Sequence, residues 1–568
     1  MRSKRGQYVG DFETTTTPND VRVWASCLVD IETAETAFIG NDIDSMFNFL
    51  KDKNSVVYFH NLKFDGEFII SYLLKNGYKY NEVGNKKPKT FEALITDAGI
   101  FYSITVYFAI ENKAYKKVVF YDSMKKLPFK VSVISKAFNL VDEKLIIDYD
   151  APRPIGHILT DEEKQYIIND CRIVAQALKI QFEQGLTKMT NASDALTGYK
   201  DILGKKSFER CFPVFPIPID HDIRGAYKGG FTYLNPKYKD KRVKGGVTLD
   251  VNSLYPSVMY DCLLPYSFPI YFEGEYKEDA NYPLYIVKLR CKFKIKEGYI
   301  PTIQLKNNRS FIETEYLTSS GGEIVTLTLT NVDLKLFLEH YDTDFLDYLC
   351  GFKFRGIQGL FKDYIDHWMQ VKENNTGALR QLAKLMLNSL YGKFATNPRA
   401  LKKVPFLDDN GVVRYELINT VEKAKAFKAS EPALREPVYT PMGCFITAYA
   451  RDKTIRSAQS VYDRFIYADT DSLHLEGVEI PEGLEIHPTK LGAWKHEGNF
   501  TDSLFVRAKT YLETIDGELK VTCAGMPDNV KELVSYDNFH SGSTFGGKLT
   551  PKRYPGGVVL ESTTFTIK

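Results

Sequence analysis

Two aspartates, Asp469 and Asp471, stand one residue apart in the segment FIYADTDSLHLEG, residues 465–477. Apolar and aromatic residues flank the pair on both sides, which is typical of a β-hairpin. Side chains two positions apart in a strand point to the same face, so a strand that continued through the pair would hold two like charges side by side. That arrangement is costly unless a cation neutralises it. An Asp-rich turn at the hairpin tip explains the same spacing equally well.

A third aspartate and a basic helix face could complete a phosphate-handling site around this pair. Asp250 follows an apolar strand in TLDVNSLYPSVM, and Tyr255 lies five positions on. In LRQLAKLMLNSLYGKFATN, from residue 379, spacings of four, four and three predict one helical face that carries Arg380, Lys384, Asn388 and Tyr391. That face has two cations, an amide and an aromatic ring but no acid, which suits a triphosphate and a base pair. A surface helix with a polar side is the plainer interpretation.

A second group of acids lies near the start of the chain. The motif DFE places Asp11 and Glu13 on one face of the first predicted strand. HNLKFDGEF supplies Asp65, and a long predicted helix carries Tyr166 and Asp170 at positions i and i+4. Each piece alone is typical of a solvated surface. Together, four carboxylates and a tyrosine suit phosphodiester hydrolysis with two divalent cations about 3.5–4 Å apart, and oxygen ligands favour Mg²⁺ or Mn²⁺.

The elements that must position these residues belong to a large chain. With 568 residues, 44% of them hydrophobic, it is long enough for roughly three or four domains. Residues 1–190 alternate β-like and helical segments, which indicates an α/β unit. The stretch from 161 predicts a helix that ends at Gly185, PVFPIPID from 213 predicts a linker, and residues 403–418 predict a hairpin with a type I′ turn at Asn410-Gly411.

The net charge of +2 means that any surface for nucleic acid must be local. Basic stretches begin at residues 235, 397 and 546, although singly each is typical of a solvated loop. We expect no membrane span, because no apolar run is long enough, and no secretory signal, because no apolar segment follows the basic start. Eight scattered cysteines without a CxxC pair predict reduced thiols and argue against a zinc site.

Three motifs in the first unit, DFE, NLKFD and YIINDCRIV, resemble those of DnaQ-type 3′–5′ proofreading exonucleases. The resemblance implies that Asp11, Glu13, Asp65 and Asp170 are the metal-site carboxylates. It also implies that Tyr166 orients the attacking water and that Lys144 contacts the scissile phosphate. The residues that it implies for holding the single-stranded 3′ end are Thr14, His60, Asn61, Phe64, Ser123 and Tyr149.

The later motifs resemble motifs A, B and C of family B DNA polymerases. By that resemblance Asp250 and Asp471, with the main chain of Val251, are the metal ligands of a polymerase site, and Asp469 is a weaker catalytic partner. The nucleotide-binding residues it implies are Tyr255, Lys372, Lys384, Asn388 and Tyr391. The DNA-binding residues it implies are Arg380, Tyr227, Gly229 and Gly230 of a YxGG motif, and Lys509 and Tyr511 of a KxY motif.

Nearly the whole chain is similar to the phi29-type, protein-primed phage members of this family. The fold this implies is multidomain, α/β and α+β, with a DnaQ-like (RNase H-like) exonuclease domain before a right-hand polymerase domain. The implied parts are the exonuclease (1–190), the palm (191–260 and 437–527), a first insertion that contacts a terminal protein (261–359), the fingers (360–396), a second insertion for processivity and strand displacement (397–436), and the thumb (528–568).

This resemblance implies a DNA-directed DNA polymerase that replicates a linear viral genome in the host cytoplasm, with proofreading. Its cofactors would be Mg²⁺ or Mn²⁺, two ions per active site. Its partners would be primer-template DNA, dNTPs and a terminal protein that acts as primer, and the enzyme would be a monomer or a heterodimer with that protein. Arg380 and Met124 depart from the usual lysine and leucine of this type, and the segment from Lys509 to Gly525 is short.

Two alternatives remain open at this point. An RNA polymerase or reverse transcriptase could share the palm, although the aromatic Tyr255 blocks a 2′-hydroxyl in the family that the chain resembles. A DNA-binding replisome component with a decayed palm could keep the fold without the activity. Both acidic clusters are intact in the sequence, which argues against decay.

Overall fold

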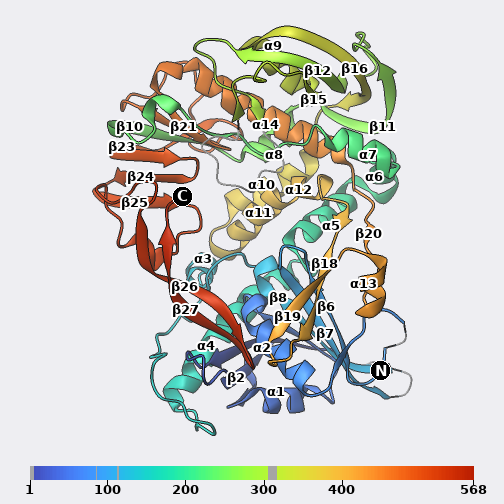
Figure 1. Ribbon diagram of the computed structural model, residues 1–568, viewed down its shortest axis with the longest axis vertical. Coiled ribbons are helices and arrows are strands. Elements are labelled where there is room, and N and C mark those ends of the chain that lie inside the picture. The colour runs from blue at the N-terminus through green and yellow to red at the C-terminus, as the bar shows by residue number, and fades with distance from the viewer. Residues whose placement is uncertain (1–4, 85, 112–113, 305–315) are drawn as a thin grey trace.

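The computed structural model describes residues 5–84, 86–111, 114–304 and 316–568 (Figure 1). The first of three large sheets has the strand order β3-β2-β1-β4-β8-β7-β6-β5. Its strands are β1 (Gly6–Thr14), β2 (Val23–Asp30), β3 (Thr36–Gly40), β4 (Ser55–Phe59), β5 (Lys79–Tyr80), β6 (Thr90–Ile95), β7 (Phe101–Glu111) and β8 (Ala114–Asp122). The helices in this part are α1 (Ile43–Leu50), α2 (Leu62–Lys75), η1 (Ser123–Lys125), α3 (Val131–Phe138) and α4 (Asp161–Glu183).

Helices cover both faces of the first sheet. All five residues of β4 are buried, and alternate side chains enter two different cores, one shared with α4 and the other with α2. A strand covered on both faces reads as a continuous apolar run rather than an alternating one, as SVVYF does. Helix α4 begins at a capping box between Thr160 and Glu163. It ends just before Gly185, whose φ is 76°, as the sequence predicted.

The second sheet is antiparallel and has the order β25-β24-β23-β10-β22-β21-β9. Its strands are β9 (Thr232–Leu234), β10 (Arg242–Val251), β21 (Phe465–Asp469), β22 (Ser472–Glu476), β23 (Trp494–Arg507), β24 (Thr510–Ile515) and β25 (Glu518–Cys523). Helices α8 (Leu254–Asp261) and α14 (Thr440–Ser460) pack against one another, and α14 also contacts β21 and β22. Two short helices, η2 (Pro236–Tyr238) and η3 (Tyr462–Arg464), join this sheet.

The third sheet has a core of its own and is inserted between α8 and α10. Its order is β11-β16-β12-β15, with strands β11 (Leu264–Glu273), β12 (Leu284–Ile295), β15 (Val325–Thr330) and β16 (Tyr341–Ile357). Helix α9 (Asn331–His340) and the short pair β13 (Ile303–Gln304) and β14 (Tyr316–Leu317) complete it. Part of the first insertion predicted from the sequence, residues 305–315, lies outside the described residues.

Two groups of helices join the sheets. The first contains α5 (Asn191–Leu203), α6 (Lys205–Cys211) and α7 (Ile217–Arg224), and the second contains α10 (Lys362–Asn374), α11 (Gly377–Ser389) and α12 (Tyr391–Phe394). The stretch from residue 213 was predicted to be a linker, but α7 begins within it. Proline is tolerated in the first turn of a helix because the N–H that it lacks has no partner there, and this is where Pro218 lies.

The hairpin predicted from residue 403 is present as β18 (Lys402–Leu407) and β19 (Val413–Ile418), with β17 (Arg399–Ala400), β20 (Ala433–Leu434) and α13 (Val421–Ala426) beside it. Its predicted type I′ turn is wrong. That turn needs positive φ at both central residues, yet Gly411 has φ 73° and Asn410 does not lie in the positive region. Asp408 sets the turn instead, because its side chain accepts hydrogen bonds from Asn410 N (3.0 Å) and Val412 N (2.9 Å).

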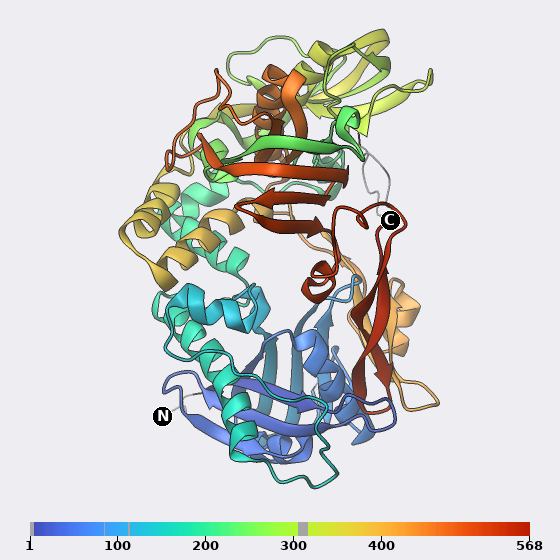
Figure 2. The same cartoon turned by 90° about the vertical axis from the view of Figure 1, so that its left-hand side faces the viewer.

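The C-terminal hairpin reaches back to the first sheet. It consists of β26 (Thr544–Tyr554) and β27 (Gly557–Thr566), with α15 (Asp528–Lys531) before it. Strand β27 packs against α2, and Figure 2 shows the dark red hairpin alongside the blue first sheet and the orange segment. A side chain on Gly557 would place its Cβ 2.3 Å from the ring of Phe68, so the close approach depends on glycine.

Two further findings concern membrane spans and cysteines in the described residues. None of the helices in the described ranges is long and apolar enough to cross a membrane. All eight cysteines lie in the described residues and are free thiols.

Candidate active sites

The first acidic cluster gathers on the central strand of the first sheet. Strand β1 carries Asp11 and Glu13, α2 carries Asp65 in its first turn, and α4 carries Asp170. Asp65, Asp170 and Glu13 are buried. The start of α2 is held by Asp122, whose Oδ1 accepts hydrogen bonds from the backbone N–H groups that open the helix, at 3.3 and 3.4 Å. The sequence analysis did not identify Asp122, because nothing local marks a cap that comes from another strand.

Burial and mutual repulsion shift the pKa values of these carboxyls. Burial, followed by the charge of Asp170, raises the pKa of Asp11 to about 7. Burial raises the pKa of Glu13, and the charges of Asp11 and Asp170 raise it further. Burial also raises the pKa of Asp65, and the charge of Asp11 adds to that shift. Groups that shift one another in this way lie within electrostatic reach. The structure therefore brings the four predicted acids together.

Lys144 and two tyrosines border the cluster. The Lys144 ammonium forms an ion pair with Asp170 and donates a hydrogen bond to the Tyr166 hydroxyl at 3.2 Å. The hydroxyls of Tyr166 and Tyr149 are hydrogen bonded, with their rings edge to face. Burial alone would lower the pKa of Lys144, but the charge of Asp170 and the bond to it raise the pKa overall. Lys144 thus neutralises one carboxylate of the four.

The residues predicted to hold a 3′ end surround the same cluster. Thr14 is the last residue of β1, and Asn61, with φ 71°, precedes α2. Phe64 is half-buried and its ring centroid lies 5.7 Å from that of Phe68. His60 and Ser123 are hydrogen bonded to one another at 2.9 Å. Because the other His60 nitrogen bonds to a backbone oxygen, we expect His60 to support the site more than to contact DNA.

The second acidic cluster lies where β10, β21 and β22 meet. Asp250 pairs with Ser472 across β10 and β22. The strand does not continue through the aspartate pair, so the same-face arrangement is wrong. It breaks at Thr470, whose φ of 61° puts a β-branched residue in the left-handed region. Asp469 ends β21, Asp471 lies in the tight turn, and Asp471 O accepts a hydrogen bond from Val251 N at 2.7 Å.

The three aspartates differ in how the protein compensates their charge. Burial, followed by Asp471, raises the pKa of Asp250 to about 7, and burial and then Asp469 raise that of Asp471. Asp469 instead accepts a hydrogen bond from Thr232 Oγ1 (3.0 Å) and pairs with Lys509 Nζ (3.2 Å). Of the three aspartates, Asp469 is the one that forms a direct ion pair with a protein cation in the described residues.

The predicted nucleotide-binding residues converge on the same region. The rings of Tyr255 and Tyr391 are stacked, with centroids 4.0 Å apart. Burial, followed by the charges of Arg380 and Lys384, lowers the pKa of Lys372, so these three cations are close together. The predicted single helical face is interrupted, because α11 ends at Ser389 and Tyr391 begins α12. Asn388 lies in the last turn of α11.

The YxGG and KxY segments lie beside the aspartate turn. A Cβ on Gly230 would be 2.6 Å from the Thr470 hydroxyl, so a bare backbone is needed there. The Lys509 backbone N–H donates a hydrogen bond to the Tyr467 hydroxyl at 2.9 Å. The ring of Tyr511 stacks on Phe505 with centroids 4.9 Å apart. Tyr227, the remaining aromatic residue of the YxGG segment, is half-buried against the main core.

Sequence reasoning missed a buried ion pair behind the YxGG segment. Arg451 of α14 is 2% exposed and bonds to both carboxylate oxygens of Asp333 at 2.8 Å. It also donates hydrogen bonds to the carbonyl oxygens of Lys228 (3.1 Å) and Gly229 (2.9 Å). Arg451 ends the segment TPMGCFITAYAR, which resembles a palm motif of family B polymerases, but no local feature of the sequence distinguishes Asp333.

The carboxylates can be tested for their fit to cations. In the described part of the chain, no three His, Cys, Asp or Glu side chains are grouped tightly enough to hold a metal ion as they stand. However, Asp65 Oδ1 and Asp170 Oδ1 are buried and have no hydrogen-bond partner. Buried carboxylate oxygens without partners are costly, and a divalent cation satisfies them. The donor set therefore fits Mg²⁺ or Mn²⁺.

Comparison with known proteins shows which family this chain belongs to. A profile of the family described as DNA polymerase type B, organellar and viral, matches residues 47–486. The DNA polymerase of Bacillus phage M2 is 48% identical over 99% of this chain and 100% of its own length. The structure of phi29 DNA polymerase with primer-template DNA covers 100% of both chains, with a TM-score of 0.93 and 46% identity.

A second solved structure gives the same result. Phi29 DNA polymerase with primer-template DNA and incoming nucleotides has a TM-score of 0.92 and 47% identity, and covers 100% of both chains. The fold is thus that of a multidomain family B polymerase with an exonuclease domain. The chain belongs to the type B DNA polymerases of organelles and viruses and, within them, to the phi29-type phage replicative enzymes.

Proposed function

We propose that this DNA polymerase copies a linear viral genome by protein priming, processively and with strand displacement, and proofreads with its own 3′–5′ exonuclease. The observation that carries the proposal is the presence of two separate carboxylate clusters on two different sheets. In each cluster, burial and neighbouring carboxylates raise the pKa of an aspartate to about 7. Such paired acidic sites suit two phosphoryl-transfer reactions in one chain.

Each cluster would hold two Mg²⁺ or Mn²⁺ ions. Asp11, Glu13, Asp65 and Asp170 are the proposed ligands at the first, and Asp250, Asp471 and the main chain of Val251 at the second. When bound, such ions lower the pKa of an attacking oxygen and stabilise the leaving oxygen. The partnerless buried oxygens of Asp65 and Asp170 support this for the first cluster. For the second, the raised pKa values of Asp250 and Asp471 support it.

At the second cluster the surrounding residues bind and orient the incoming nucleotide. Lys372, Lys384 and Arg380 offer three neighbouring cations for a triphosphate, with Arg380 also proposed to contact DNA. The stacked rings of Tyr255 and Tyr391 would support the base and exclude a ribose 2′-hydroxyl. Asn388 lies on the same helix and can hydrogen bond to the substrate. Asp469 would orient Lys509 toward the primer terminus through their ion pair.

At the first cluster, Tyr166 and Lys144 act on the scissile phosphate. The Tyr166 hydroxyl, bonded to Tyr149 and Lys144, would orient the attacking water. The Lys144 ammonium would bind the phosphate oxygen. The single-stranded 3′ end would be held by Thr14, Asn61, Phe64 and Tyr149, with His60 and Ser123 supporting them.

DNA and the terminal protein would occupy the remaining surfaces. Tyr227, Gly229 and Gly230 would contact the template, and Lys509 and Tyr511 the primer. We place the terminal-protein contact on the third sheet, within the predicted insertion 261–359. The predicted palm (191–260 and 437–527), fingers (360–396) and thumb (528–568) would surround the DNA. The enzyme would act in the host cytoplasm, as a monomer or as a heterodimer with the terminal protein.

A primer extension assay with magnesium tests the activity against its alternatives. We expect extension with dNTPs and little or none with NTPs, because Tyr255 excludes the 2′-hydroxyl. Efficient use of NTPs would favour an RNA polymerase, and no extension at all would favour a replisome component with a decayed palm. Incubation with labelled dATP and candidate partners tests protein priming, since it should yield a covalent protein–nucleotide adduct.

The second insertion, 397–436, is proposed to give processivity and strand displacement. Replacing residues 400–434 with a short Gly-Ser linker should yield short products that stall at duplex DNA, because the β18–β19 hairpin lies between the first sheet and the C-terminal hairpin. Addition of single nucleotides to an open primer should stay nearly normal. Products are measured on a singly primed circle with excess competitor DNA. Full-length rolling-circle products would contradict this assignment.

A further inference from the structure

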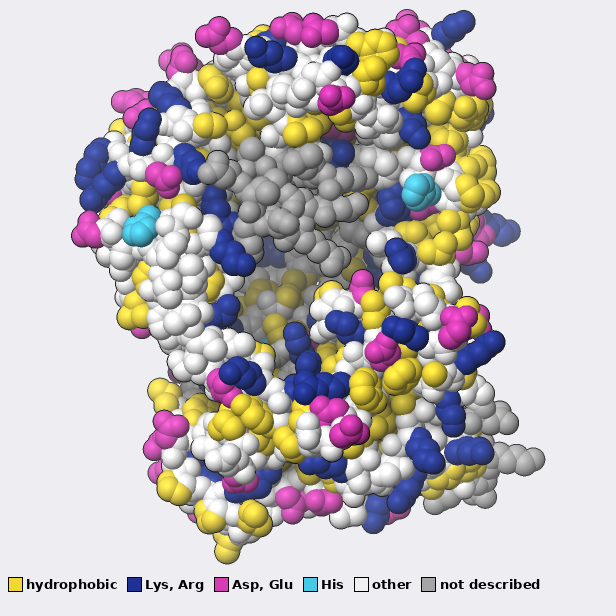
Figure 3. All heavy atoms as spheres, viewed as in Figure 1, with side chains coloured by type: hydrophobic (Ala, Val, Ile, Leu, Met, Phe, Trp, Pro, Cys, Tyr) yellow, Lys and Arg dark blue, Asp and Glu magenta, His cyan; other side chains and the backbone are white. Residues whose placement is uncertain are grey.

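A basic cavity lies where the first sheet, the β18–β19 hairpin and the C-terminal hairpin meet. Its volume is about 400 Å³. Its lining includes Lys63 of α2, Lys403 of β18, Arg414 of β19 and Arg553 of β26, and no acidic residue. Figure 3 shows Lys and Arg side chains grouped below the central hollow of the molecule, over this region. Four cations from three separated parts of the chain therefore face one space.

Only two of these cations are neutralised by acids in the described residues. Arg553 Nε bonds to Glu67 Oε1 at 2.8 Å, and Arg414 Nε bonds to Asp408 Oδ2 at 2.8 Å. Neither Lys63 nor Lys403 forms an ion pair within that part of the chain. The cavity thus keeps an excess of two positive charges, which favours an anionic ligand.

The walls of the cavity are fixed by a buried contact. Glu67 is 3% exposed and accepts hydrogen bonds from both Arg553 and the Tyr415 hydroxyl, the latter at 2.8 Å. The Arg553 guanidinium also lies 4.7 Å from the centre of the Tyr415 ring. This contact joins α2, β19 and β26, so the four cations are held on rigid elements rather than on loose loops.

The first turn of α2 links the cavity to the first acidic cluster. Lys63 and Asp65 lie in the first turn of α2, two positions apart, so they project to different sides of one helical turn. One turn of an α-helix rises about 5.4 Å. The same turn of α2 therefore carries one carboxylate of the first acidic cluster and one cation of the cavity.

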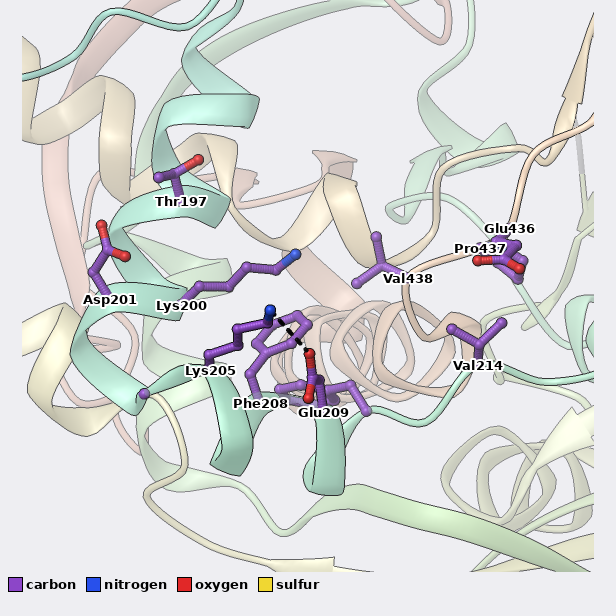
Figure 4. A pocket seen from close by; sticks show the side chains of 12 residues that line it. Thr197, Lys200, Asp201, Lys205, Phe208, Glu209, Val214, Glu436, Pro437 and Val438 are labelled. Carbon is purple, nitrogen blue, oxygen red and sulfur yellow. Dashed lines mark ion pairs between the residues drawn. The ribbon is translucent and has the colours of Figure 1, made fainter.

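A larger cavity differs from this one in its balance of charge. The cavity between α5, α6 and residues 436–438 has a volume of about 610 Å³ (Figure 4). Its two lysines are accompanied by three acids, and Lys205 pairs with Glu209 at 3.9 Å. That balance of charge gives no preference for an anionic ligand.

We propose that the basic cavity binds the phosphate groups of single-stranded DNA next to the exonuclease site. The proposal rests on the exonuclease function proposed above. Lys63 and Lys403 supply the free ammonium groups, and Arg553 and Arg414 supply fixed donors. Such contacts bind backbone without sequence preference and weaken as salt rises. A released mononucleotide carries the same phosphate chemistry and is the other source to be distinguished.

The test measures binding of oligothymidylates without divalent metal, so that nothing is degraded. Fluorescence anisotropy compares a strand of about four nucleotides with one of about twelve, a range that spans typical single-strand site sizes. For the parent we expect the longer strand to bind more tightly. For Lys403→Gln we expect the dissociation constant of the longer strand to rise about fivefold, and the slope of log affinity against log salt to fall by about 0.7. The short strand should bind as before.

The matched control is Lys425→Gln, which removes the same charge from exposed α13 in the same insertion and should leave both strands unaffected. Lys403→Glu should weaken binding of the longer strand further, and circular dichroism shows whether each variant is folded. If dTMP removes the Lys403-dependent part of binding, the phosphate site stands and its ligand is the mononucleotide. Equal salt slopes for the parent and Lys403→Gln, with no effect of dTMP, would overturn the proposal. Failure of the short strand to bind the parent would contradict the exonuclease function instead.

Discussion

The two acidic clusters neutralise their charge in different ways. At the first, acids from one strand and two helices converge, and Lys144 pairs with only one of them, Asp170. At the second, a strand end and a strained hairpin tip bring three aspartates together, and Asp469 is held by Lys509. Within the described residues, one acid in each cluster forms a direct ion pair with a protein cation and the others form none. We therefore expect removal of the acids that form no ion pair to reduce activity more than removal of the paired acids.

The largest expected effect is at the second cluster. Asp471→Asn removes a charge that forms no direct ion pair in the described residues, and we expect primer extension to fall by roughly a thousandfold, the order that loss of one preorganised charge-stabilising group costs. Asp469→Asn should cost only about tenfold, because the protein already offsets that charge. Exonuclease activity should persist in both, as measured on single-stranded DNA. Equal losses in the two variants would break the comparison.

The next expected effect is at the first cluster and tests its independence. Asp11→Ala combined with Asp170→Ala should abolish degradation of single-stranded DNA, because two of the four proposed ligands are lost. Primer extension should stay within about twofold of the parent, since the second cluster lies on another sheet. Both activities are measured on the same preparation. Loss of both, in a variant that circular dichroism shows to be folded, would mean that the clusters are coupled.

The pH dependence of stability should reveal the acids whose pKa is raised in the folded chain. The pKa of Asp250 is about 7 in the folded chain against an ordinary 3.8. A raised carboxyl pKa contributes stability that is fully present below the ordinary value and is lost as the pH rises through about 7. In EDTA, the Tm of the parent should therefore fall more than that of Asp250→Asn between pH 4 and pH 7. Asp344→Asn, at an exposed position of β16, is the control and should follow the parent.

The same Tm measurement can be repeated with added Mg²⁺. Because cations would offset the repulsion, adding Mg²⁺ at pH 8 should raise the Tm of the parent more than that of Asp250→Asn. If the two proteins gain equally, Asp250 does not interact with the added ion.

The smallest expected effect concerns the backbone beside the aspartate turn. Gly230→Ala would place a methyl group 2.6 Å from the Thr470 hydroxyl, so the turn that carries Asp471 must shift. We expect primer extension to fall by about tenfold, because small misplacements in an active site are costly, while exonuclease activity is kept. Gly198→Ala in α5, where a methyl group meets nothing within 4 Å, serves as the control. Unchanged extension by Gly230→Ala would show that the turn tolerates the shift.

Local patterns predicted much of the fold. The helix ending at Gly185 and the hairpin from residue 403 followed from periodicity and turn residues, and both are present. The separate acids of the first cluster were also expected to converge, and their shifted pKa values indicate that they do. The roles assigned to these residues remain predictions.

The rest depended on contacts between distant parts of the chain. The sequence left open whether the strand passes through Asp469 and Asp471 or turns there, and pairing of Thr470 N with Phe231 O helps to fix the turn. The predicted type I′ turn does not form, because the Asp408 side chain accepts hydrogen bonds from the backbone N–H groups of the turn. The contact of Glu67 with Arg553 joins residues 486 positions apart, and no local pattern encodes such a pair.

The buried pair of Arg451 and Asp333 limits how the enzyme can be rearranged. Asp333 belongs to the third sheet, which otherwise resembles a removable module with its own core. Yet its carboxylate compensates an arginine whose other nitrogen holds the carbonyl groups of the YxGG segment. Removing one partner of a buried ion pair costs about 3–5 kcal/mol. A chimera that exchanged this module for another would therefore have to bring its own acid for Arg451.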